Sequence, residues 1–410
     1  MYKPFEETSS AEDIRSGWHY LQLPGPTNIP QRVLAAMHRP AIDHRGKAFP
    51  ELAMGLFEGM REVFKTEEEI FIYPSSGTGG WEAAIANTLS PGDKVLMFDS
   101  GMFSLLWIKM AKAFKLDVQI IENDWRRGPN PDEIETILRE DTGHEIKGVL
   151  VVHNETTTGV AARVPDIRKA IDNANHPALF FVDTISSLGS MEYKHDEWGV
   201  DVSVGGSQKG LMLPPGLGFN AVSEKARKAS ETSEMPCCYF DWEWMQENNA
   251  TGYFPYTPAI QMFYGLRESL AMLRAQGLDA VFARHDRLAR ATRAAVKAWG
   301  FVTVCAEPLE YSSSVTAVFL PEGHDADTFR NLVLDRHNLA LGGGLARLAG
   351  KVFRIGHMGD SNDLMIAGTL AGIEMGLQAA GITFKSSGVV AANTLFALGT
   401  SAEGLAAAAE

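Results

Sequence analysis

The strongest constraint on how this chain can fold is an alternation that repeats through its middle. A short β-forming run ends in glycine or polar residues and a helical pattern follows, as in EIFIYPSSGTGGWEAAIANTL and DKVLMFDSGMFSLLWIKMAKAF. The β runs are apolar on both faces, which is what parallel strands covered by helices require. The alternation therefore predicts an α/β fold with a mostly parallel central sheet, whose ligands bind beyond the C-terminal ends of the strands.

The pattern changes near Tyr264, where a long helical stretch begins and short β runs follow. Two of these runs, SVTAVFLP and KVFRIGH, flank the helical segment DADTFRNLVLDRH and predict a smaller α+β domain. The length of 410 residues also favours two domains. We expect an N-terminal arm over residues 1–30, a large domain over 31–274, a small C-terminal domain over 275–388, and a tail over 389–410 that is a weakly held helix or disordered.

The amino-acid composition limits the classes of partner that this protein can bind. A formal net charge of −14 argues against nucleic acid or an anionic membrane as the main partner. No apolar run approaches a membrane span, and the N-terminus lacks the features of a signal peptide. The three cysteines have no metal-binding spacing, so we expect no metal, and they favour a reducing compartment, here the cytoplasm.

One lysine stands out in the stretch VGGSQKGLMLPPGLGF. Lys209 is surrounded by glycines, prolines and apolar residues. Burial disfavours the ammonium form of a lysine, and the neutral amine is a nucleophile that condenses with aldehydes. The alternative is a lysine at a strand edge whose amine reaches water.

A glycine-rich loop follows a predicted strand and opens a predicted helix. In SSGTGG, the small residues Ser76, Gly77 and Thr78 would let backbone N–H groups approach an anion at the helix N-terminus. The spacing fits neither a P-loop nor a dinucleotide fingerprint. A tight turn without a ligand is the alternative.

Asp183 ends the apolar strand ALFFVD, where a carboxylate needs a cation or a hydrogen-bond donor. A protonated ring nitrogen would serve, although Asp183 could also cap the next helix. Trp107 could stack on a flat ring or belong to the core, and the same alternatives hold for His153 at another strand end. Together with the lysine and the anion site, these features describe one cofactor, pyridoxal 5′-phosphate.

Longer segments extend this interpretation to a family. The match extends over nearly the whole chain and rests on seven segments: LPGPTNIP, DHRG, SSGTGGWEAAIANTLSPGDKV, VVHNETTTGV, DEWGVDVSVGGSQKGLMLPPGL, TGYFPYTPAI and VFRIGHMGD. The sequence resembles the class V aminotransferases of fold type I, and within them the serine–glyoxylate and alanine–glyoxylate aminotransferases. GSQKGLMLPPGL with GYFPYTP is most similar to the bacterial serine–glyoxylate branch.

The resemblance implies a role for each matching residue. Lys209 matches the lysine that forms a Schiff base with the cofactor, and Asp183 the partner of the pyridinium nitrogen. The other cofactor-binding positions are Ser76, Gly77, Thr78 and Gln208 near the phosphate, Trp107 stacked on the ring, and Thr156 near the phenolic oxygen. Tyr256 and Thr257 match a pair that reaches the phosphate from the neighbouring subunit, and Gly25 lies where the N-terminal segment closes over substrate.

Arg354 matches the arginine that binds the substrate α-carboxylate, and the residue type suits this task. A guanidinium binds a carboxylate with two parallel hydrogen bonds and stays charged at any working pH. The alternative is that Arg354 forms a salt bridge on the surface. Its position between a short β run and the glycine-containing turn RIGHMGD argues against this alternative. The chain departs from many relatives at Thr184, whose extra hydroxyl beside Asp183 could alter contacts with the cofactor.

The resemblance implies a transaminase with ping-pong kinetics. Glyoxylate would accept the amino group to give glycine, and L-serine would donate it to give hydroxypyruvate, with alanine and aspartate as alternative donors. The enzyme would be a homodimer with shared active sites, or a tetramer. A cysteine desulfurase of the same fold is the alternative from another class, but Cys305 lies in an apolar run where a thiol is usually inert. A non-catalytic binding protein would not require both Lys209 and Asp183.

Overall fold

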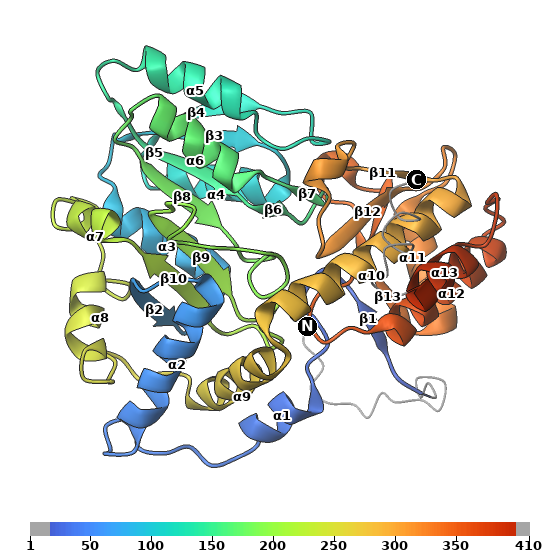
Figure 1. Cartoon of the computed structure of the whole chain (residues 1–410), viewed down its shortest axis with the longest axis horizontal. Helices are drawn as coiled ribbons and strands as arrows, with labels where there is room; N and C mark the ends of the chain where they lie inside the picture. The colour runs from blue at the N-terminus through green and yellow to red at the C-terminus, as the bar shows by residue number, and fades with distance from the viewer. Residues whose placement is uncertain (1–16, 399–410) are drawn as a thin grey trace, which may run out of the picture.

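The computed structural model describes residues 17–398, which form two large sheets, each with its own helices. Figure 1 shows the seven-stranded sheet on the left and the five-stranded sheet on the right, with α9 (Ile260–Gln276) and α10 (Leu278–Trp299) running from one to the other. The boundary predicted near residue 274 falls beside Gly277, which separates these two helices. The division into domains itself stays a prediction.

The larger sheet confirms the predicted α/β architecture. Its strands lie in the order β2-β10-β9-β8-β5-β3-β4, and only β10 runs antiparallel to its neighbours. The strands are β2 (Glu69–Tyr73), β3 (Lys94–Asp99), β4 (Asp117–Glu122), β5 (Ile146–Val152), β8 (Leu179–Asp183), β9 (Val202–Gly206) and β10 (Gly218–Val222). A short hairpin, β6 (Asn154–Glu155) with β7 (Val160–Ala161), follows β5.

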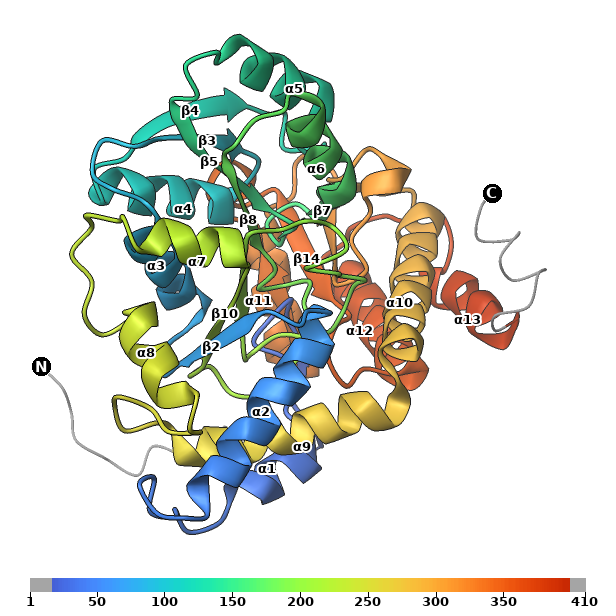
Figure 2. The ribbon, with the colours of Figure 1, turned by 60° about the vertical axis from the view of Figure 1, so that its left-hand side comes forward.

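Helices cover both faces of this sheet. In β5, Val149 and Val151 enter one apolar cluster while Leu150 and Val152 enter the other, because successive side chains of a strand point to opposite faces. The first face is covered by α2 (Phe49–Phe64), α5 (Pro131–Glu140), α6 (Val164–Asn173) and α9. The second is covered by α3 (Gly77–Thr88), α4 (Met102–Ala113), α7 (Glu224–Ser230) and α8 (Trp242–Asn249), which Figure 2 shows together on one side.

The smaller sheet has the order β1-β13-β14-β12-β11. Its strands are β1 (Tyr20–Gln22), β11 (Val302–Thr303), β12 (Val315–Phe319), β13 (Leu339–Gly343) and β14 (Val352–Gly356). One face packs against α10, α11 (Ala326–His337), α12 (Asp363–Ala379) and α13 (Gly388–Leu398). Phe353 and Ile355 of β14 point into that cluster, so the intervening Arg354 points the other way, toward the larger sheet.

Both the first and the last described segments pack against the smaller sheet. Within the predicted arm, Tyr20–Gln22 pairs in parallel with β13 and so completes the smaller sheet, and α1 (Gln31–Met37) follows. Within the predicted tail, α13 is packed rather than weakly held, because Ala392 and Leu395 are buried against the helices of the smaller sheet. Residues 1–16 and 399–410 lie outside the described part of the chain.

Within residues 17–398 no helix has the length and apolar character needed to cross a lipid bilayer. The cytoplasmic location stays a prediction.

Candidate active site

A cavity of about 130 Å³ lies where parallel strands of the larger sheet end. Asp183 is the last residue of β8, Lys209 follows β9, and Phe103 and Thr156 follow β3 and β5. This is the edge at which such sheets bind ligands. The lining residues are Ser76, Gly77, Thr78, Trp81, Phe103, Asn154, Thr156, Asp183, Ile185, Ser186, Gln208 and Lys209.

Lys209 is only 8% exposed, and its Nζ donates a hydrogen bond to the carbonyl oxygen of Pro24 at 2.7 Å. Burial, reinforced by the positive charge of Arg354, lowers the pKa of the lysine to about 8, and Asp183 opposes this change. The N-terminal segment therefore passes directly over the amine, and closure of Gly25 over a substrate stays a prediction. A neutral amine is available here near neutral pH, which a nucleophile requires.

Asp183 is 4% exposed and forms no ion pair with any described residue. Its Oδ1 accepts from the backbone N–H of Ile185 at 2.6 Å, and its Oδ2 accepts from the indole Nε1 of Trp81 at 3.2 Å. Burial raises the pKa of this carboxyl to about 7, with a further rise from Glu155. A cation such as a protonated ring nitrogen would favour its ionised form.

The N-terminus of α3 opens into the same cavity. Its N-cap residue, Ser76, makes no side-chain hydrogen bond to the first turn, so the first-turn N–H groups are not capped in this way. The Oε1 atom of Gln208, nearby, is buried without a partner among the described residues. Unpaired donors at a helix start fit a phosphate.

Thr156 connects the cavity to the smaller sheet. Its hydroxyl donates to the Oγ atom of Ser186 at 2.8 Å, which itself donates to the carbonyl of Asn154 at 2.8 Å. The carbonyl oxygen of Thr156 accepts from Nη1 of Arg354 at 2.9 Å, and Nε of Arg354 donates to Gly343 at 2.7 Å. The arginine thus lies close behind the cavity, although it does not line it.

Arg354 is 7% exposed and forms no ion pair with a described residue. Burial lowers its pKa to about 10, so it stays charged near neutral pH. A buried cation held only by carbonyl oxygens lacks a full counter-charge. An incoming carboxylate would provide one.

The structure corrects the position of the aromatic platform. Trp107 is fully buried and stacks on Trp81, with ring centroids 5.6 Å apart, instead of lining the cavity. Phe103, one turn earlier on α4, lines it. Residues four apart lie on the same face of a helix. The sequence pattern therefore indicates the face of α4 that points toward the cavity, but not which residue on that face lines it.

Two other sequence features have structural roles only. The hydroxyl of Thr184 donates to the carbonyl of Val204 at 2.9 Å, and this residue does not line the cavity. His153 packs against Tyr193 and Trp198, and burial lowers its pKa to about 4. Neither residue lines the cavity.

Tyr256 and Thr257 lie apart from the cavity of their own chain. Tyr256 stacks on Tyr239 with centroids 4.2 Å apart, and its hydroxyl donates to the carbonyl of Cys238 at 3.0 Å. Thr257 is exposed. Any action of these two hydroxyls on a cofactor would therefore take place in another subunit.

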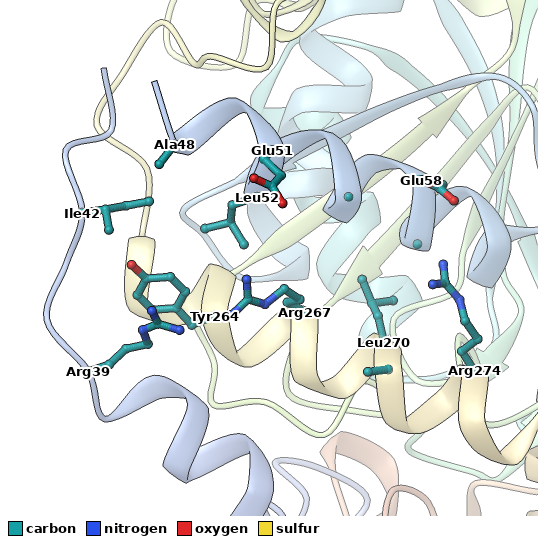
Figure 3. A pocket seen from close by; sticks show the side chains of 13 residues that line it. Arg39, Ile42, Ala48, Glu51, Leu52, Glu58, Tyr264, Arg267, Leu270 and Arg274 are labelled. Atoms are coloured by element: carbon teal, nitrogen blue, oxygen red, sulfur yellow. The ribbon is translucent and has the colours of Figure 1, made fainter. Parts of the chain in front are cut away.

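A larger hollow of about 410 Å³ lies elsewhere, between α2 and α9 (Figure 3). Glu51 and Glu58 of α2 face Arg267 and Arg274 of α9 across it. Its lining residues include no lysine, cysteine, serine, threonine or histidine. Its size alone therefore does not make it the reaction site.

The smaller cavity fits pyridoxal phosphate on several independent grounds. It combines a buried amine of lowered pKa, a buried carboxylate without an ion pair among the described residues, an uncapped helix start and an aromatic ring. Lys209 would hold the aldehyde carbon, Asp183 the ring nitrogen and the start of α3 the phosphate. Fold and site together define an enzyme of the pyridoxal-phosphate-dependent fold type I class.

Comparison with known proteins specifies this class further. The family model described as aminotransferase class V matches residues 19–355. A serine–glyoxylate aminotransferase of Methylorubrum extorquens is 52% identical and covers 93% of this chain and 96% of its own. An L-aspartate–glyoxylate aminotransferase of Paracoccus denitrificans is 48% identical, covering 90% and 94%. The chain belongs to the class V aminotransferases.

A solved structure agrees with this assignment. The crystal structure of pyridoxamine–pyruvate aminotransferase from Mesorhizobium loti matches with a TM-score of 0.87 and 27% identity, over 92% of this chain and 97% of that one.

Sequence analysis missed several residues that line the cavity: Trp81, Phe103, Asn154, Ile185 and Ser186. Asn154 and Ser186 were detectable in principle, since each closely follows the end of a parallel strand. Trp81 gave no such indication, because its place in the helical stretch GTGGWEAAIANT is typical of a core residue.

Proposed function

We propose that this aminotransferase transfers the amino group of L-serine to glyoxylate, giving hydroxypyruvate and glycine. Relatives that carry the name serine–glyoxylate aminotransferase, at 52% and 49% identity over more than nine tenths of the chain, support this pair of substrates. The observation that carries the substrate class is Arg354, a buried cation without an ion pair among the described residues, close to the Lys209 amine whose pKa it lowers. Both substrates present a carboxylate to it.

Each residue has a defined task in this proposal. When bound, pyridoxal phosphate supplies the aldehyde carbon for the amino group and a ring that takes up the electron pair of the substrate's Cα. Lys209 would take the proton from Cα and deliver it to the carbon that carried the cofactor's aldehyde, which its lowered pKa favours. Asp183 keeps the proton on the ring nitrogen. Arg354 orients the substrate through its carboxylate.

A second donor has specific support. The relative named L-aspartate–glyoxylate aminotransferase is 48% identical, nearly as similar as the serine–glyoxylate relatives. Aspartate, like serine, presents an α-carboxylate to Arg354. It differs in carrying a second carboxylate, which would need a cation of its own.

The desulfurase alternative has little structural support. Cys305 is buried, its Sγ lies 3.5 Å from the carbonyl oxygens of Glu307 and Glu310, and burial raises the pKa of the thiol to about 11. A catalytic thiol needs the reverse, a lowered pKa and access to substrate.

A donor panel tests the proposal. Serine, alanine and aspartate are compared at fixed glyoxylate, with glycine and the matching oxo acid quantified. We expect serine to have the highest kcat/KM and the Lys209→Ala variant to form no glycine with any donor. A higher value for aspartate would replace serine by the second candidate. In a separate incubation with cysteine, release of sulfide would favour the desulfurase.

We also propose a homodimer in which each active site is completed by the partner subunit. Tyr256 and Thr257 support this, since they lie away from the cavity of their own chain and their hydroxyls suit a phosphate. Symmetric two-fold assembly is the commonest form of oligomer. Sedimentation of the active enzyme would test this, and an active monomer would contradict it.

A further inference from the structure

Glu155 is a buried carboxylate beside the cavity that no step of the proposed reaction uses. It is 1% exposed and lies in β6, between the cavity residues Asn154 and Thr156. It forms no ion pair with a described residue. Burying a charge in this way is unfavourable unless hydrogen bonds compensate for the lost water.

Backbone N–H groups of Thr157 and of the first turn of α4 provide the compensation. Oε2 of Glu155 accepts from the backbone N–H of Ser104 at 3.1 Å. Oε1 accepts from the N–H of Thr157 at 3.0 Å. First-turn N–H groups have no partner within a helix and lie at the positive end of its dipole, so an anion is held there strongly.

The chain leaves space for this carboxylate. A Cβ atom added to Gly101, the N-cap residue of α4, would lie 2.3 Å from Cδ of Glu155. A side chain at position 101 would therefore displace the carboxylate from the helix start. Gly101 has an extended backbone that any residue adopts, so the close approach explains the glycine.

We propose that Glu155 is a positioning residue, whose carboxylate holds the first turn of α4 so that the ring of Phe103 faces the cofactor. Phe103 lines the cavity, and the N–H that the carboxylate binds in this turn belongs to the next residue, Ser104. The inference rests on the proposed cofactor site but not on the choice of amino donor.

Charge provides a second, independent consequence. Burial raises the pKa of Glu155, and when this carboxylate is ionised its negative charge favours the protonated form of Arg354, whose Nη1 bonds the carbonyl of the adjacent Thr156. Loss of that charge would leave Arg354 more attractive to a substrate carboxylate. Glu155→Gln should therefore weaken cofactor binding without raising the KM for serine, whereas general damage to the site would impair both.

The test measures cofactor affinity directly. Pyridoxal 5′-phosphate is titrated into apoprotein while the quenching of tryptophan fluorescence is followed. Glu155→Gln should weaken binding about tenfold, the loss expected for a hydrogen bond to a charged group. Gly101→Ala displaces the same carboxylate without changing its charge and should weaken binding similarly, which keeps the test available if Glu155→Gln does not fold.

A double-mutant cycle with Phe103→Leu separates positioning from unrelated damage. If Glu155 acts through Phe103, the double variant should bind the cofactor about as weakly as Phe103→Leu alone, because interacting residues are not additive. Additive losses would overturn the proposal, as would unchanged affinity in both Glu155→Gln and Gly101→Ala. Failure of serine as donor would contradict the proposed reaction but would leave this titration unaffected.

Glu310→Gln is the matched control. Glu310 is also a buried carboxylate that accepts from a backbone N–H, that of Gly128 at 2.7 Å, and it pairs with Arg163 away from the cavity. Its substitution should leave cofactor affinity unchanged. A loss equal to that of Glu155→Gln would show that any buried carboxylate has this effect and would overturn the proposal.

Discussion

The carbonyl oxygen of Pro24 accepts a hydrogen bond from Nζ of Lys209, a residue 185 positions later in the chain. The N-terminal segment therefore contacts the lysine of the candidate site directly. Gly25 follows with a φ of +107°, and a Cβ atom there would lie 2.4 Å from Nζ. Backbone conformation and space both require glycine at this position.

Gly25→Ala should therefore lower kcat severely, by about a hundredfold, because the methyl group would occupy the place of the reactive amine. Gly323→Ala is the control, since Gly323 also has a positive φ but open space around its Cβ position. It should have near-normal activity. Steady-state kinetics of both variants decide the matter, and equal losses would mean that backbone strain alone is responsible.

The pH dependence of cofactor capture should follow Lys209. Its pKa of about 8 means that the neutral amine becomes the major form as the pH rises through this value. The rate at which apoprotein reacts with pyridoxal phosphate should therefore increase with pH around a midpoint near 8. Arg354→Met should move the midpoint upward, because the positive charge of Arg354 lowers this pKa. A rate that is independent of pH in stopped-flow measurements would contradict the assignment.

Substitutions of Phe103 and Trp107 test which of these two aromatic residues of α4 contacts the cofactor. Phe103→Leu should weaken binding of pyridoxal phosphate by roughly two- to tenfold, because a ring contact is worth roughly 0.5–1.5 kcal/mol beyond its buried area. Trp107→Phe should mainly lower the thermal midpoint, since Trp107 is a fully buried core residue. The reverse result in fluorescence titrations would restore the sequence-based choice of Trp107.

These two residues also show what the sequence could and could not predict. Strands that are apolar on both faces correctly predicted a mostly parallel sheet. Most of the predicted site residues lie at the ends of these strands, where Asp183 and Lys209 line the same cavity. Which residue on a helix face reaches the cavity depends on tertiary packing, here the stacking of Trp107 on Trp81. The periodicity of the sequence does not contain this information. The short strand at Tyr20–Gln22 depends on pairing with a strand more than 300 residues away, and no local pattern indicates that.

Arg354→Lys should weaken serine and glyoxylate alike, because both would bind through a carboxylate. Lysine keeps the charge but loses the paired donors, so the loss should be about 1.5–3 kcal/mol, or roughly ten- to two-hundredfold in kcat/KM. Binding of pyridoxal phosphate should hardly change, since Arg354 does not line the cavity. Each half-reaction is measured separately. A loss for one substrate only, or a loss of cofactor, would show that Arg354 has another role.

Mixed dimers test whether Tyr256 and Thr257 act across subunits. Lys209→Ala should abolish activity, and a Tyr256→Phe, Thr257→Val double variant should weaken phosphate binding and lower activity strongly. When the two proteins are unfolded together and refolded, mixed dimers should contain one intact site, formed by Lys209 of one subunit and the hydroxyls of the other. Activity should therefore return to roughly a quarter of the wild-type value, because half of the dimers are mixed and each has one working site in two. Refolding each variant alone is the control. If Tyr256 and Thr257 acted within their own chain, no mixed dimer would hold a complete site, and the refolded mixture would be no more active than the average of its two parents.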